Sequence, residues 1–465
     1  MIPLPQLVVA GPLGLGVLLF RGLGLRCVDA VAYWAWIWIA GCLAFGAAMQ
    51  VGIELGAPRV TAWVVGSAGL LYLISLVFRR RKREPRLRSP EASPVGSWFG
   101  AFVWLGAVWC LWFAIAGADR PCIEGDEGNI WSLKAKSLLC DWPDLFASAQ
   151  VYNLHPDYPQ LNPLLQAWTY CLSSELLFLP FPQFANRCLV QGCDVALFLA
   201  VAGALRHRLP ALPAAVLSSL LLLEPEFHGL LRTAYADGMV ALGLVVAVDG
   251  YLRYRERNDR RYAWLAGLGL AFALWSKNET MLYLAAALPA AVIARLFARE
   301  RQPLAPRAFL PLLPALAVIA NHTVWNWRFG MKSDLLGANP TGKSMFTLMA
   351  EQWTERVPAM AAEAVRVAAS LQHAHVVFVL LVLGMFLVPR LALRGPAALP
   401  LLALPIGWIG IHVVYVGSFL PLRFHLDTSY ARVTFQLVPA AIVLLGALAS
   451  DVVAARRAGH TGPSP

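Results

Sequence analysis

The chain has 465 residues, of which 58% are hydrophobic and only 14% are charged, and its formal net charge is +11. Soluble domains carry about 25% charged residues, so this composition excludes an ordinary set of soluble domains. Long apolar runs recur along the sequence, and a run of about 20 residues crosses the hydrocarbon core of a bilayer as a helix. The sequence therefore predicts an all-α, polytopic membrane protein.

Reading along the chain, we find about 13–14 apolar segments of this kind. They cover residues 4–20, 30–51, 59–78, 97–117, 160–180, 186–205, 210–223, 236–253, 263–276, 280–298, 308–327, 375–392, 398–418 and 433–450. The segment at 160–180 begins beside two prolines and contains Glu175, so it is interpreted as a half-span or an interfacial segment. The first segment lacks a basic leader, and no cleavable signal peptide is expected.

Basic clusters indicate which connecting loops face the cytoplasm, because such loops stay on the inner side of the membrane. The strongest cluster is RRRKREPRLR, and others lie at 253–261, 295–301, 390–394 and 456–457. They sit on short connections, which does not favour nucleic-acid binding. With these clusters inside, the loops expected outside are residues 118–160, 224–236, 328–372 and 419–432.

The first outside loop carries the densest group of carboxylates. Its sequence GDEG places Asp126 and Glu127 between two glycines, which permit a tight turn at the start of a helix. The dipole at a helix N-terminus favours negative charge. The pattern predicts that both carboxylates are presented at the start of a juxtamembrane helix, and a solvated helix cap is the plainer alternative.

Residues 127–139 show the pattern of an amphipathic helix. One half of the helical wheel is apolar and carries Ile130, Trp131, Leu133 and Leu138. A helix of this kind lies flat in the membrane interface. Lys134 falls toward the apolar half, so we expect it either to snorkel or to point into a polar cavity.

Further ionisable residues fall at the outer ends of predicted spans. Asp237 lies in YADG, Lys277 and Glu279 lie in SKNET, and His425 and Arg432 precede the last span. Each group has a plainer interpretation, as a helix cap, a loop ion pair or an interface anchor. Ionisable groups at membrane depth are costly, however, and usually line a pathway or a site. Because all these groups fall on one side of the membrane, we expect one shared site.

Carboxylates and cations at an outer membrane face suit group transfer. A carboxylate can take a proton from an acceptor hydroxyl, and cations can stabilise charge on a leaving phosphate. The sequence has no Walker motif and no dinucleotide fingerprint, so a soluble nucleotide donor is not expected. No cofactor is indicated, and although a divalent metal is compatible with the carboxylates, no His or Cys spacing predicts one. These features favour sugar transfer from a polyprenyl-phosphate carrier.

In their order and topology, these motifs resemble the GT-C superfamily of integral-membrane glycosyltransferases, and most closely glycosyltransferase family 39. The resemblance covers about residues 97–450, from GDE through HPDYP, YADG and SKNET to the late outside arginine. It implies a GT-C fold, inverting transfer and an essential acid that aligns with Asp126. Expected domains are a three-span extension at 1–95, a catalytic domain at 96–455 and a disordered tail at 456–465.

The expected site combines the motif residues with the nearby cations. Expected catalytic residues are Asp126, Glu127 and Asp237. Expected substrate-binding residues are Lys134, His155, Tyr158, Lys277, Glu279, His425 and Arg432. The expected partners are a polyprenyl-phosphate sugar, an acceptor that is a lipid, glycan or protein, and membrane lipids. The expected location is the bacterial inner membrane, with the site on the periplasmic side.

Two alternatives stay open at this point. A transporter or flippase of lipid-linked sugars also needs charged residues in a membrane cavity, and a non-catalytic envelope subunit would need no catalytic site. A disulfide between Cys122 and Cys140 would clamp the amphipathic helix. The intervening helix of about 20 Å works against it.

Overall fold

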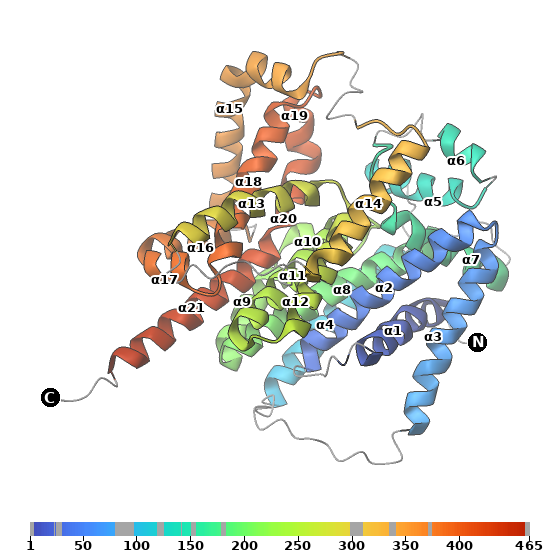
Figure 1. Ribbon diagram of the computed structural model, residues 1–465, viewed down its shortest axis with the longest axis horizontal. Coiled ribbons are helices and arrows are strands. Elements are labelled where there is room, and N and C mark those ends of the chain that lie inside the picture. Colours follow the sequence, from blue (N-terminus) through green and yellow to red (C-terminus); the bar gives the residue numbers. More distant parts are fainter. Residues whose placement is uncertain are drawn as a thin grey trace.

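In the computed structural model, every secondary-structure element of the described part is a helix (Figure 1). The structure describes residues 4–22, 24, 30–79, 97–118, 125–140, 142–149, 155–177, 183–297, 310–333, 341–370 and 374–460. The predicted all-α architecture is confirmed. Cys122 lies outside the described residues, so the Cys122–Cys140 disulfide considered above stays open.

The helices follow one another in this order: α1 (Leu4–Gly22), α2 (Ala30–Glu54), α3 (Pro58–Arg79), α4 (Ser97–Ala118), η1 (Glu127–Ser132), α5 (Leu133–Ser137), α6 (Asp144–Ala149), α7 (Leu161–Leu177), α8 (Gln183–Arg208), α9 (Ala211–Leu222), α10 (Pro225–Leu230), α11 (Asp237–Arg257), α12 (Arg260–Ser276), α13 (Glu279–Phe297), η4 (Leu310–Leu312), α14 (Leu313–Arg328), α15 (Met345–Ala369), α16 (Val376–Leu387), α17 (Pro389–Arg394), α18 (Ala398–Val416), α19 (Leu422–His425), η5 (Leu426–Tyr430), α20 (Ala431–Phe435) and α21 (Val438–His460).

Seven stretches of helix in the described part are long and apolar enough to cross a membrane. They are Ala30–Glu54, Pro58–Leu76, Trp98–Gly117, Arg187–Arg208, Glu279–Phe297, Ala398–Val416 and Leu422–Arg457. Several other predicted segments form shorter helices, among them α7, α9, α12, α14 and α16. The chain is therefore a multi-pass membrane protein.

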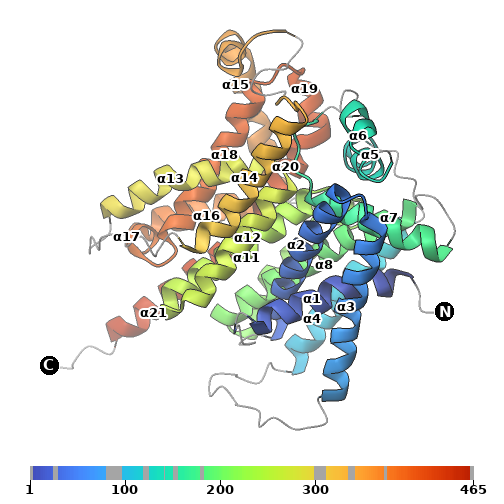
Figure 2. The same ribbon diagram turned by 45° about the vertical axis from the view of Figure 1, so that its right-hand side comes forward.

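The elements formed by three predicted outside loops share one end of the molecule. Figures 1 and 2 show α5, α6, α15 and α19 on the upper side, whereas α3 and α21 end on the lower side. The lower ends carry Arg79 and Arg456, which belong to predicted cytoplasmic clusters. This arrangement agrees with the sidedness that the basic loops indicate.

Helices α8 and α11 lie at the centre and position the site. Helix α11 packs closely against α12 because glycines line the contact. A Cβ on Gly243 would come within 2.7 Å of the carbonyl oxygen of Gly269, and one on Gly250 within 2.7 Å of the backbone nitrogen of Ala266. Small residues of this kind let two membrane helices approach closely.

Helices α1–α3, expected as an N-terminal addition, pack against α7 and α8. The predicted tail differs in part from the structure, because α21 continues as a helix to His460. Residues 461–465 lie outside the described residues. Residues 161–173 of α7 are buried throughout, so this 17-residue segment is covered by protein, and its expected place as a half-span or interfacial segment stays a prediction.

The predicted outside loop 328–372 contains a 25-residue amphipathic helix, α15, that the sequence analysis missed. Its buried residue Arg356 donates hydrogen bonds to the carbonyl oxygens of Tyr415, Ser418 and Leu420. Tyr415 lies in the last turn of α18, and Ser418 and Leu420 follow that helix. Helix α15 is thereby fixed against the outer end of α18.

The juxtamembrane helix predicted at 127–139 is confirmed as helical, formed by η1 and α5. Its apolar side chains Ile130, Trp131 and Leu138 are fully buried within the protein. The expectation that this helix lies flat in the membrane interface is therefore wrong. Protein covers the face that was expected to contact lipid.

Candidate functional site

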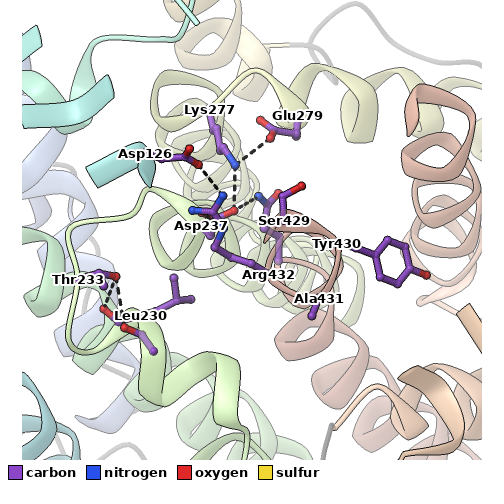
Figure 3. A network of polar contacts seen from close by, with 12 residues as sticks. Asp126, Leu230, Thr233, Asp237, Lys277, Glu279, Ser429, Tyr430, Ala431 and Arg432 are labelled. Carbon is purple, nitrogen blue, oxygen red and sulfur yellow. Dashed lines mark hydrogen bonds and ion pairs between the residues drawn. The ribbon is translucent and has the colours of Figure 1, made fainter. Parts of the chain in front are cut away.

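The structure brings five of the predicted site residues into one cluster (Figure 3). Arg432 Nη2 lies 2.5 Å from Asp126 Oδ2, and Arg432 Nε lies 3.7 Å from Asp237 Oδ2. Lys277 Nζ lies 3.0 Å from Asp237 Oδ1 and 2.8 Å from Glu279 Oε1. Segments far apart in sequence therefore meet in a continuous network of ion pairs.

Helix ends explain how these side chains come to the same place. Asp237 and Glu279 each occupy the first position of a helix, α11 and α13, where the helix dipole favours a carboxylate. Lys277 follows the last residue of α12, where the dipole favours a cation. The α12–α13 turn thus brings Lys277 beside both carboxylates.

The cluster has a buried floor and a more accessible rim. The side chains of Asp237 and Lys277 are only 1% and 2% exposed. Those of Arg432 and Asp126 are 12% and 27% exposed, and that of Glu279 is 21% exposed. A ligand approaching from solvent therefore meets Asp126, Arg432 and Glu279 first.

Electrostatics keep the buried cation charged. Burial alone would lower the pKa of Lys277, but Asp237 and Glu279 outweigh it, and its pKa lies above the usual lysine value. Tyr235 borders the cluster, with its ring 4.2 Å from the Arg432 guanidinium. Burial raises the pKa of Tyr235 to about 12, with Arg432 acting in the opposite direction, so its hydroxyl stays protonated.

Gln436 and Tyr283 complete the floor, and the sequence analysis missed both. The buried amide of Gln436 donates a 2.6 Å hydrogen bond to Asp237 Oδ1 and accepts a 2.9 Å bond from the Tyr283 hydroxyl. With Lys277 also on Oδ1, the other oxygen of Asp237 is turned toward Arg432. An amide within the otherwise apolar run FQLVP was the signal that could have revealed Gln436.

Glu127 does not share the cluster with Asp126, and its expected catalytic role stays a prediction. Its buried carboxylate accepts hydrogen bonds of 2.6 and 2.8 Å from Arg187 and one of 2.8 Å from the backbone N–H of Ala234. Arg187 also donates to the carbonyl oxygen of Gly117 at the end of α4. Glu127 therefore ties η1 to α4, α8 and the segment that leads into α11.

Arg187 escaped the sequence analysis because it lies at the start of an apolar segment and 60 residues from its partner. A lone arginine among apolar residues inside a predicted span was the available signal, since such a charge needs a partner.

Lys134 organises a loop, and the snorkelling position considered for it is wrong. Its fully buried ammonium donates to the carbonyl oxygens of His155, Pro156 and Tyr158 at 2.9–3.0 Å. These contacts replace the substrate-binding role expected for Lys134 with a structural one.

The HPDYP loop reaches the site through Tyr158. The Tyr158 ring stacks on His155 at 4.5 Å and on Trp131 at 5.5 Å. Its hydroxyl lies 3.4 Å from Glu279 Oε1. Tyr158 thus borders the rim, and His155 supports it from the side. His425, predicted as a substrate-binding residue, lies beside Ser418, with which it shares a 2.7 Å hydrogen bond, and Tyr415.

The first turn of α11 packs against a second buried carboxyl, Asp194 of α8. Among the described residues, neither carboxyl oxygen of Asp194 has a hydrogen-bond partner. A Cβ on Gly238 would lie 1.7 Å from Asp194 Oδ1. Glycine is therefore required directly after Asp237.

We expect Gly238→Ala to destabilise the protein by about 1–3 kcal/mol, because the added methyl group overpacks the α8–α11 contact. Combining it with Asp194→Ala should restore much of the loss. Thermal unfolding of the detergent-solubilised protein measures both effects. Gly229→Ala is the matched control, since a Cβ there meets nothing within 4 Å. Equal melting temperatures for Gly238→Ala and Gly229→Ala would contradict the packing argument.

Within the described ranges, no group of three or more His, Cys, Asp or Glu side chains is arranged to hold a metal ion. The acidic residues of the cluster are instead paired with Lys277 and Arg432.

No family model, curated protein or solved structure matches this chain.

Proposed function

We propose that this chain is a membrane glycosyltransferase that moves a sugar from a polyprenyl-phosphate carrier to an acceptor hydroxyl. The observation that carries this proposal is the rim pair: a partly exposed carboxylate, Asp126, and a partly exposed guanidinium, Arg432, sit side by side over a buried ionic floor. A base and an anion-stabilising cation at one site are the two groups that such a transfer needs.

In the proposed reaction, the acceptor oxygen attacks the anomeric carbon and gives its proton to Asp126. The bond between that carbon and the phosphate oxygen breaks, and the phosphate leaves with the electron pair. Arg432 stabilises the charge on the leaving phosphate. A single displacement of this kind inverts the anomeric configuration. Asp237 holds Arg432 from below, at 3.7 Å.

The charges along α11 support a site on the periplasmic side of a bacterial inner membrane. Asp237 begins this 21-residue helix, and near its other end Arg253 pairs with Asp249 at 2.9 Å. Arg208 of α8 pairs with Asp249 and Glu256 at the same end. A helix of this length spans about 30 Å, the thickness of the hydrocarbon core. The basic network fits the cytoplasmic side.

The test is donor turnover by the purified protein. We expect a polyprenyl-phosphate hexose, mixed with an envelope extract that supplies acceptors, to be converted to free polyprenyl phosphate, as detected by mass spectrometry. A transporter would move the lipid across a vesicle membrane without cleaving it. Loss of donor from one leaflet without release of polyprenyl phosphate would therefore contradict the proposal.

A further inference from the structure

The two residues of the rim ion pair each adjoin a π-helical segment. Asp126 directly precedes η1, and Arg432 follows the end of η5 by two residues. π-Helices account for well under 1% of residues in globular proteins and occur frequently at functional sites. In the part of the chain that the structure describes, both π-helical segments adjoin this one contact.

The two cations of the cluster differ in their availability to a ligand. Lys277 is enclosed by Asp237 and Glu279 and is only 2% exposed. Arg432 is 12% exposed, and its Nη2 donates a hydrogen bond to the half-buried Asp126. An anion from solvent can therefore compete for Arg432. Lys277 is already paired with the buried carboxylate of Asp237 and the partly exposed carboxylate of Glu279.

Arg432 keeps its position without Asp126. Its guanidinium lies over the Tyr235 ring at 4.2 Å, and its Nε faces Asp237. Asp126 is by contrast the more exposed partner, with 27% of its side chain accessible against 12% for Arg432. If the pair opens, Asp126 is thus the partner that moves.

Charge balance makes such an opening necessary for an anionic ligand. The cluster contains three carboxylates and two cations, so its net charge is −1. A phosphate that entered beside Asp126 would add like charge at close range, which is unfavourable. The phosphate can bind Arg432 favourably only in place of Asp126.

We propose that Asp126 occupies the phosphate subsite of the empty protein and that the phosphate group of a lipid-phosphate ligand displaces it from Arg432. This inference rests on the proposed function and adds an ion-pair exchange to it. The incoming phosphate releases the Asp126 carboxylate, which is then free to accept a proton. Donor binding thereby exposes the base, and an empty site keeps the base paired.

The test is binding of decyl phosphate to the purified protein without acceptor, measured by calorimetry. We expect Asp126→Asn to bind decyl phosphate three- to tenfold more tightly than the unchanged protein, because the competing carboxylate is gone. In an Arg432→Gln background, Asp126→Asn should no longer tighten binding. A general electrostatic effect of one lost charge would persist in that background and would overturn the exchange.

Asp427→Asn is the matched control, because Asp427 faces the exposed Arg423 at 3.5 Å in the same segment. Its affinity should equal that of the unchanged protein. Inorganic phosphate should bind more weakly than decyl phosphate, and equal affinities would overturn the lipid assignment. If Asp126→Asn binds decyl phosphate with unchanged or lower affinity, the ion-pair exchange is overturned but the proposed function is not. Absence of decyl phosphate binding at millimolar concentration counts against the proposed function as well.

Discussion

Asp126→Asn is expected to lower the rate of donor turnover about 100- to 10,000-fold, the range that a positioned general base contributes. The substitution keeps the size of the side chain and removes its ability to take a proton. Asp126 is partly exposed, so the fold should tolerate the change. The measurement is the rate of polyprenyl phosphate formation in quenched single-turnover reactions, because it reports the chemical step and not product release.

Two comparisons make this result specific. Asp427→Asn removes an exposed carboxylate of the same outer face and should leave the rate unchanged. Asp126→Glu keeps a carboxylate and should retain part of the activity. A rate for Asp126→Asn within threefold of the unchanged protein would mean that the base lies elsewhere or that no base is used.

Glu127→Ala is expected to destabilise the protein by about 3–5 kcal/mol, because it leaves a buried arginine without its counter-ion. Arg187 and Glu127 are only 2% and 1% exposed and share two hydrogen bonds. Chemical denaturation of the solubilised protein, with an intrinsic fluorescence readout, measures the loss. This loss of stability differs in kind from the effect of Asp126→Asn, which is expected to slow turnover without unfolding the protein.

The double variant Glu127→Leu with Arg187→Met separates lost charge from lost packing. Replacing both partners of a buried pair by apolar groups is often neutral, so this variant should be much more stable than Glu127→Ala. Glu351→Ala supplies the surface control, since its pair with Lys343 is exposed and should contribute about 0–1 kcal/mol. Similar losses for Glu127→Ala and Glu351→Ala would show that the buried pair is not a structural clamp.

The sequence predicted that the charged residues lie close together, but it was a poorer guide to the partners of each one. Basic loops and apolar segments predicted the same side of the membrane for Asp126, Asp237 and Arg432, and this was enough to expect them in one place. Adjacent residues of a helix point about 100° apart. A motif of two acids therefore does not reveal which one faces the site, and Glu127 was assigned to catalysis for that reason.

The remaining errors concern partners that are distant in sequence. Arg187 and Gln436 lie within apolar segments, where a single polar side chain adds little to a pattern, and their partners lie 60 and 199 residues away. Lys134 was placed by its position on a helical wheel, but three backbone carbonyls of a later loop determine where it lies. Such contacts depend on tertiary packing and leave no periodic signal.

Helix α11 is anchored by buried charge at both ends, with Asp237 paired to Lys277 and Asp249 paired to Arg208 of α8. A piston displacement of one helical turn, about 5.4 Å, would break both anchors together. These two anchors therefore hold α11 in register with α8 and with the turn that follows α12.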